Sequence, residues 1–149
     1  MDNFTKAENQ NRPAAVNLLN RLISDHPSFK GWQLKETKPE DKTRYDFWLE
    51  KDNKKILIEH KARNYPKTAF KDWMISGKKV EALRNLIKDD VIGVFYVNTF
   101  LDGSAIWNLN KDIGTWRLSR PHTITTVEES PLTQTYDLFL KLEEAGYTE

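Results

Sequence analysis

Apolar residues near the start of the chain follow the spacing of an amphipathic helix. Leu18, Leu19, Leu22 and Ile23 repeat with a period of about 3.6 residues, which predicts a helix over residues 6–24. Pro13 would then lie in its first turn, where the missing N–H costs little.

The rest of the chain alternates between strand-like and helix-like patterns. Short apolar runs predict strands, a helical stripe of Val80, Leu83 and Ile87 predicts a second helix, and Asp102-Gly103 predicts a hairpin turn. The expected strands cover residues 29–35, 91–100, 104–109, 116–118 and 123–127, and the expected helices after the first cover residues 72–88 or 76–88 and 133–144.

Between the first strand and the second helix, residues 43–61 are expected to form a tight hairpin. Asp52 and Asn53 both tolerate positive φ, as a two-residue turn requires. The residue numbers of cross-strand partners then add up to 105, and the apolar side chains gather on one face of the hairpin. These are Phe47, Leu49, Ile56 and Ile58.

The same register places three charged residues on the other face of the hairpin. Asp46 falls opposite Glu59, and Lys61 lies two residues further along on the same side. Two carboxylates beside an ammonium group are expected to hold a divalent cation with a base next to it. An exposed hairpin with an ordinary cross-strand ion pair is the alternative interpretation.

This arrangement resembles the PD-(D/E)XK nuclease superfamily, in which a strand bearing Asp pairs with a strand bearing Glu-x-Lys. The motif reads Tyr45-Asp46 and Glu59-His60-Lys61, with Tyr45 where the family name has Pro. The resemblance covers about residues 5–110. It implies an α/β fold with the restriction endonuclease-like αβββαβ core, in which helices flank a mixed central sheet, as in small phage-type nucleases and Holliday junction resolvases.

The tripeptide by itself is weak evidence, because an acidic residue stands two positions before a lysine four times in the chain, at Glu36, Glu40, Asp52 and Glu59. Only Glu59 ends an apolar strand, Ile56-Leu57-Ile58, of the kind that is covered on both faces. Ionisable residues at the end of such a strand are costly unless they are used.

The resemblance also implies roles for the residues around the motif. Asp46, Glu59 and the backbone carbonyl of His60 would hold Mg²⁺ or Mn²⁺, while the His60 side chain points to the opposite face. Lys61 would orient the attacking water and stabilise charge on the phosphate. Glu8, the one Glu of the first helix, is a candidate for completing the catalytic set, although the helix dipole alone would favour a carboxylate there.

Composition narrows the classes of protein that need to be considered. A chain of 149 residues is expected to form one domain, residues 1–149. It has no cysteine, which excludes disulfides and thiolate zinc sites and fits a cytoplasmic location. We expect no membrane partner, because the longest apolar run falls far short of the roughly 20 residues that a span needs.

Positive charge is concentrated next to the motif, although the net charge is only +1. Residues 51–84 contain ten Lys or Arg and four acids, an excess of six positive charges. A basic surface beside the motif would suit a phosphate backbone, and a plain solvated face is the alternative. The candidate nucleic-acid contacts are Arg63, Lys78, Lys79 and Arg84.

The sequence therefore predicts a metal-dependent nuclease that hydrolyses phosphodiester bonds, with DNA favoured over RNA as its partner and substrate, and a DNA endonuclease as the leading form. The alternative is a catalytically inactive nuclease-like scaffold that binds nucleic acid or a protein. Monomer and homodimer both stay open.

Overall fold

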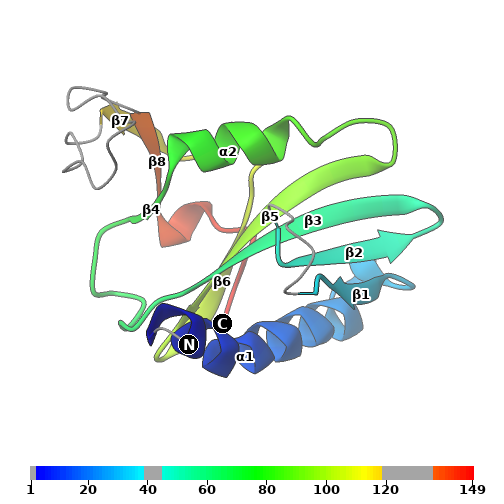
Figure 1. Ribbon diagram of the computed structural model, residues 1–149, viewed down its shortest axis with the longest axis horizontal. Coiled ribbons are helices and arrows are strands. Elements are labelled where there is room, and N and C mark those ends of the chain that lie inside the picture. Colours follow the sequence, from blue (N-terminus) through cyan, green and yellow to red (C-terminus); the bar gives the residue numbers. More distant parts are fainter. Residues whose placement is uncertain (1–2, 39–44, 119–135) are drawn as a thin grey trace.

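The computed structural model describes residues 3–38, 45–118 and 136–149, with side chains from Arg12 onward. Within these ranges the chain forms an α/β fold with two α-helices, a six-stranded mixed sheet and a three-stranded sheet (Figure 1). The helices are α1 (Asn3–Asp25) and α2 (Gly77–Arg84), with short 3-10 helices η1 (Pro27–Phe29) and η2 (Leu142–Glu144). The strands are β1 (Gln33–Glu36), β2 (Phe47–Lys51), β3 (Lys54–Ala62), β4 (Trp73–Ile75), β5 (Val91–Phe100), β6 (Gly103–Asn108), β7 (Thr115–Leu118), β8 (Tyr136–Leu140) and β9 (Tyr147–Thr148).

The six-stranded sheet has the order β1-β2-β3-β5-β6-β9, and β3 and β5 are its one parallel pair. A parallel pair needs a crossover connection, and the segment between β3 and β5 contains β4 and α2. In Figure 1, α1 runs along one side of the sheet and α2 lies on the other. The predicted central position of residues 91–100 is confirmed, because β5 lies between β3 and β6.

Each face of the large sheet has its own hydrophobic core. The α1 face buries Leu18, Leu19 and Leu22 against Phe47 and Ile58. The opposite face buries residues of α2 and the small sheet against the other side of β3, β5 and β6, including Leu57, Leu83, Val94, Trp107 and Leu138. Ile56, Leu57 and Ile58 are therefore all buried, because β3 is covered on both faces.

The first helix is longer than its predicted span of residues 6–24 and places Pro13 in its interior. The prediction that Pro13 would lie in the first turn is therefore wrong. An interior proline removes a backbone hydrogen bond and costs about 3 kcal/mol. Burial of Ala15, Leu18, Leu19 and Leu22 on the same helix offsets that cost.

Three other predicted elements differ from the structure. Residues 29–35 begin as η1 and become a strand only at Gln33, and the second helix is confined to Gly77–Arg84 because Trp73–Ile75 forms β4. The closing helix over residues 133–144 is wrong. Its described part forms β8 and η2, because Leu138 and Leu140 are buried where β8 pairs with both β4 and β7.

The predicted strand over residues 123–127 lies outside the described residues, whereas the one over 116–118 is confirmed as part of β7. No helix in the described ranges has the length and apolar character needed to cross a membrane.

Candidate active site

The β2–β3 hairpin has the predicted turn and the predicted register. Asp52 and Asn53 have φ values of 50° and 65°, so both adopt the left-handed conformation of a two-residue turn. Phe47 pairs with Ile58 and Leu49 with Ile56, so partners sum to 105. The four apolar hairpin residues share one face, as expected, and the structure shows that α1 covers this face. Glu59 and Lys61 are in phase with Leu57 on the α2 face.

Asp46 directly precedes β2 and is held there by its own backbone. Its N–H donates to the carbonyl of Ile58 at 2.9 Å. Its carbonyl accepts from the N–H of Thr37 at 3.0 Å, from the Thr37 hydroxyl at 2.8 Å and from Arg12 Nη2 at 3.2 Å. These contacts connect Arg12 of α1 and Thr37, which follows β1, to the backbone of Asp46. They fix the position of its Cα atom and therefore of its side chain.

The carboxylate of Asp46 is directed at the backbone of β3. Its Oδ2 accepts a hydrogen bond from the N–H of His60 at 2.9 Å. The peptide that carries this N–H joins Glu59 to His60, so the Asp46 carboxylate lies next to the Glu-x-Lys segment. The predicted cross-strand pair of Asp46 with Glu59 is not part of the ladder, which ends at Phe47 and Ile58. Asp46 reaches the Glu-x-Lys segment through its side chain instead.

Glu59 lies under α2. Its Oε1 is 2.7 Å from Lys79 Nζ, and the Glu59 side chain is 14% exposed. The predicted phosphate contact Lys79 is therefore the counter-ion of a largely buried carboxylate. A lysine on the crossover helix, next to the buried Val80, was the available sequence signal, but its partner depends on how α2 docks on the sheet.

Lys61 and Glu59 face β5 through the parallel pairing, in which Glu59 pairs with Tyr96 and Lys61 with Asn98. Lys61 is partly buried. Asn98 is fully buried, and Tyr96 is 3% exposed. A polar residue within the apolar run of residues 91–100 was the sequence signal for Asn98.

Arg63, which follows β3, links that strand to β4 and β5 through hydrogen bonds. Its Nε donates to Asn98 Oδ1 at 2.8 Å, and its Nη2 donates to the carbonyl of Met74 at 2.8 Å and to the hydroxyl of Tyr96 at 3.0 Å. The guanidinium also lies 5.4 Å from the centre of the Trp73 ring. Burial raises the pKa of the Tyr96 phenol, and the neighbouring Arg63 opposes that rise. These contacts engage the guanidinium group that the sequence predicts to bind nucleic acid.

His60 points to the α1 face, as predicted. Its Nε2 is 2.9 Å from Thr99 Oγ1, and its ring packs against Phe47 with centroids 6.4 Å apart. Burial lowers the pKa of the imidazole to about 4, the Asp46 carboxylate opposes this shift, and Arg12 reinforces it. The His60 side chain is thus a neutral structural group, and only its carbonyl stays a candidate metal ligand.

The remaining predicted residues lie on the two helices. Lys78 is exposed on α2, while Arg84 Nε donates to the carbonyl of Leu109 at 2.8 Å and Nη2 donates to that of Lys111 at 3.4 Å. Glu8 is in α1, but its side chain lies outside the described residues.

Two carboxylates and backbone oxygens are the candidate metal ligands at the end of β3, and Lys61 lies beside them. No group of three or more His, Cys, Asp or Glu side chains able to hold a metal is present among the described residues. Asp46 and Glu59 offer the hard oxygen atoms that Mg²⁺ binds, and Mg²⁺ usually combines one or two carboxylates with water. The donor set therefore fits such an ion, provided that Lys79 leaves Glu59.

Comparison with known proteins adds no family to this description: no family model matches the chain, and no curated protein matches it.

Proposed function

We propose that this protein is a metal-dependent nuclease of the PD-(D/E)XK type that hydrolyses phosphodiester bonds, with DNA as its expected substrate. The observation that carries the proposal is the hydrogen bond from the His60 N–H to Asp46 Oδ2. It brings one carboxylate to the peptide that follows Glu59, in a hairpin whose register also directs Lys61 to the Glu59 side.

The order of elements supports the same proposal. The helix α1, the strands β1, β2 and β3, the helix α2 and the strand β5 follow the αβββαβ order that the resemblance implies, with β4 inserted before α2. The proposed site lies at the carboxyl end of β3, where it pairs in parallel with β5. Crevices beside the carboxyl ends of strands are the usual binding place in α/β sheets.

Asp46, Glu59 and the carbonyl of His60 would hold Mg²⁺ or Mn²⁺. The bound ion would supply positive charge for the phosphate and lower the pKa of a bound water. Lys61 would orient that water and stabilise negative charge that develops on the phosphate. Lys79 neutralises Glu59 without the ion, so metal binding would release an ammonium group beside the substrate phosphate.

A second candidate is a nuclease-like scaffold that binds nucleic acid or a protein without cleaving. The closed ion pair between Glu59 and Lys79 favours this alternative, because Lys79 already supplies the positive charge that a metal would bring. The two candidates differ in whether a divalent ion binds at Asp46 and Glu59.

Metal binding and cleavage test the proposal together. Mg²⁺ or Mn²⁺ at about 100 times its Kd should stabilise the fold by about 2.7 kcal/mol and raise the Tm by roughly 5 to 10 °C. Asp46→Ala and Glu59→Ala should each abolish this rise and the metal-dependent cleavage. Lys61→Ala should keep the rise in Tm but slow cleavage by at least about 10²-fold, because it acts on water and charge rather than as a ligand.

The matched control is Glu50→Ala, which removes a β2 carboxylate that pairs in register with Lys55, away from the site. It should retain both the Tm shift and the cleavage. Supercoiled, linear, branched and single-stranded substrates, each with Mg²⁺, Mn²⁺ or EDTA, cover the substrate classes. If wild type cleaves none of them and no ion raises its Tm, the nuclease proposal fails and the scaffold replaces it.

A further inference from the structure

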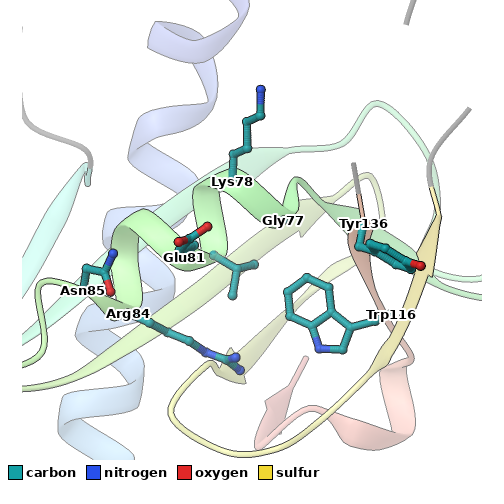
Figure 2. Close-up of a pocket in the computed structure, with 8 residues that line it drawn as sticks. Gly77, Lys78, Glu81, Arg84, Asn85, Trp116 and Tyr136 are labelled. Carbon is teal, nitrogen blue, oxygen red and sulfur yellow. The ribbon is translucent and has the colours of Figure 1, made fainter. Parts of the chain in front are cut away.

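An open groove lies between α2 and the small sheet, and Lys78 and Arg84 are the predicted site residues that line it. Its volume is about 570 Å³, within the range of small-molecule sites. In Figure 2 the Trp116 indole extends from β7 toward α2, whereas the Tyr136 ring extends from β8 away from the helix. The groove is lined by Gly77, Lys78, Val80, Glu81, Arg84, Asn85, Trp116 and Tyr136.

Two large aromatic side chains are exposed in this groove. Trp116 is 42% exposed and Tyr136 is 61% exposed. The core of the fold does not need them, because the inward residues Leu138 and Leu140 already anchor β8. Aromatic faces left open beside positive charge are typical of surfaces on which nucleobases stack.

The groove is shaped by specific contacts. Gly77 N–H donates to Asp137 Oδ1 at 3.0 Å, which draws the start of α2 onto β8. A Cβ on Gly77 would come within 3.2 Å of the Trp116 ring, so the indole lies directly against the helix. At the other end, the hydrogen bonds from Arg84 to the carbonyls of Leu109 and Lys111 hold its planar guanidinium in place.

The charges of the groove discriminate between the parts of a nucleotide. Lys78 and Arg84 attract phosphate, whereas the Glu81 carboxylate between them on α2 repels it and can accept hydrogen bonds from amino groups of a base. The Lys78 side chain extends away from the two aromatic rings in Figure 2, and Arg84 already donates to two carbonyls. A base against Trp116 or Tyr136 would therefore have its phosphate at the edge of the groove, where a flexible lysine can turn to it. Duplex DNA, whose bases are stacked on each other, cannot offer a free base face to them.

We infer that this groove binds an unpaired nucleotide of a single-stranded nucleic acid by stacking its base on Trp116 and Tyr136. The inference rests on the proposed function for its choice of nucleic acid, and it narrows the substrate to strands with unpaired bases, such as single strands, flaps or branch points. The helix α2 connects the two places, because Lys79, next to Lys78, is the residue that contacts Glu59.

The test measures binding without cleavage. Fluorescence anisotropy in EDTA compares a labelled single strand of about 12 nucleotides with the duplex of the same sequence, at about 0.1 M salt. Wild type should prefer the single strand. Trp116→Ala and Tyr136→Ala should each weaken single-strand binding by at least about 5-fold, the lower end for loss of one stacked base, and should change duplex binding little.

Two controls make the result specific to stacking. Trp116→Phe should restore most of the affinity that Trp116→Ala loses, because it keeps an aromatic face. Phe70→Ala removes another exposed aromatic ring, 52% exposed and outside the groove, and should leave single-strand affinity unchanged. Glu81→Gln should tighten binding slightly by removing a repulsive charge.

The outcomes separate this inference from the nuclease proposal. Equal binding of single strand by wild type and Trp116→Ala overturns the groove assignment even if the protein cleaves DNA with metal. If single-strand binding depends on Trp116 but the protein cleaves no substrate, the groove assignment is supported and the scaffold replaces the nuclease as the function. A change of oligomeric state in Trp116→Ala, seen by sedimentation with no change in binding, overturns the inference and makes the groove a self-association surface.

Discussion

At the scale of single residues, the backbone and side chain of Asp46 connect most of the proposed site. Its carbonyl accepts from Thr37 and Arg12, its N–H pairs with β3, and its carboxylate accepts from the His60 N–H. Because each of these groups has a partner, the carboxylate is held without help from a metal. Preorganised ligands of this kind lower the entropic cost of binding an ion.

His60 should make the stability of the protein depend on pH. The folded state holds its pKa at about 4, below the usual value of about 6.5 in an unfolded chain. Between these pH values the unfolded state binds more protons, so stability is full above pH of about 6.5 and is lost as the pH falls toward 4. The loss attributable to this imidazole should approach about 3 kcal/mol.

Urea unfolding across this pH range, in EDTA, measures the effect in wild type and in His60→Gln. The variant keeps a polar side chain near Thr99 but cannot titrate, so its stability should vary less with pH. If the free energy of unfolding falls equally with pH in both proteins, His60 does not contribute to the pH dependence of stability.

At the scale of elements, α2 is the piece that joins the proposed catalytic site to the groove. Ser76 caps its first turn by accepting from the N–H of Lys79, and Val80 and Leu83 bury its inner face. The helix has eight residues, too short to be stable by itself. Its position therefore depends on docking at Gly77, Glu59 and Arg84.

Gly77→Ala should destabilise the protein although alanine is the better helix former by about 1 kcal/mol. A Cβ at this position would lie 1.8 Å from the carbonyl oxygen of Tyr136, a backbone atom that cannot move without shifting β8. The net cost should be about 1 to 3 kcal/mol, and Tm or urea unfolding measures it.

Gly146→Ala is the matched control, because the nearest atom to a Cβ there is 3.9 Å away and the substitution should be close to neutral. If Gly77→Ala proves as stable as wild type, the close docking of α2 on β8 is wrong.

At the scale of the whole molecule, a central strand of the large sheet and the edge strand β7 of the small sheet differ in how deeply they are buried. Most residues of β5 are buried and its strand is central, while all four residues of β7 are exposed. Local opening of β7, the edge strand of the small sheet, would thus uncover little apolar surface, whereas β8 holds the buried Leu138 and Leu140. Because β7 carries Trp116, that sheet edge can adjust to a ligand without disturbing the large sheet.

Hydrogen exchange should be slower in β3 and β5 than in β7. Amides in the middle of β3 and β5 should exchange only through global unfolding, while those of β7 should exchange at least about 10²-fold faster through local opening. Mass spectrometry of peptic fragments measures both in one experiment. Equal protection of β5 and β7 would mean that the sheets open together.

The sequence by itself determined the local part of this architecture. The Asp52-Asn53 turn and the alternation around it specify the β2–β3 register, because a slip of one residue would move every apolar side chain of one strand to the wrong face. The first helix, most of β5 and the presence of a β5–β6 hairpin follow from equally local patterns, although the turn predicted at Asp102-Gly103 lies one residue earlier, at Leu101-Asp102, because Gly103 pairs with Phe100.

Only the tertiary structure decided how distant segments meet. The parallel register that pairs Glu59 with Tyr96, the ion pair between Glu59 and Lys79, and the strand β8 in place of a helix all depend on contacts across long stretches of chain. No tight turn connects such partners, so local sequence patterns cannot specify their register. For β8, burial of its apolar side chains between the sheets outweighs the local preference for a helix. The hairpin that carries Asp46 and Glu59 could therefore be predicted from the sequence, whereas the ion pair of Glu59 with Lys79 and the groove at Trp116 could not.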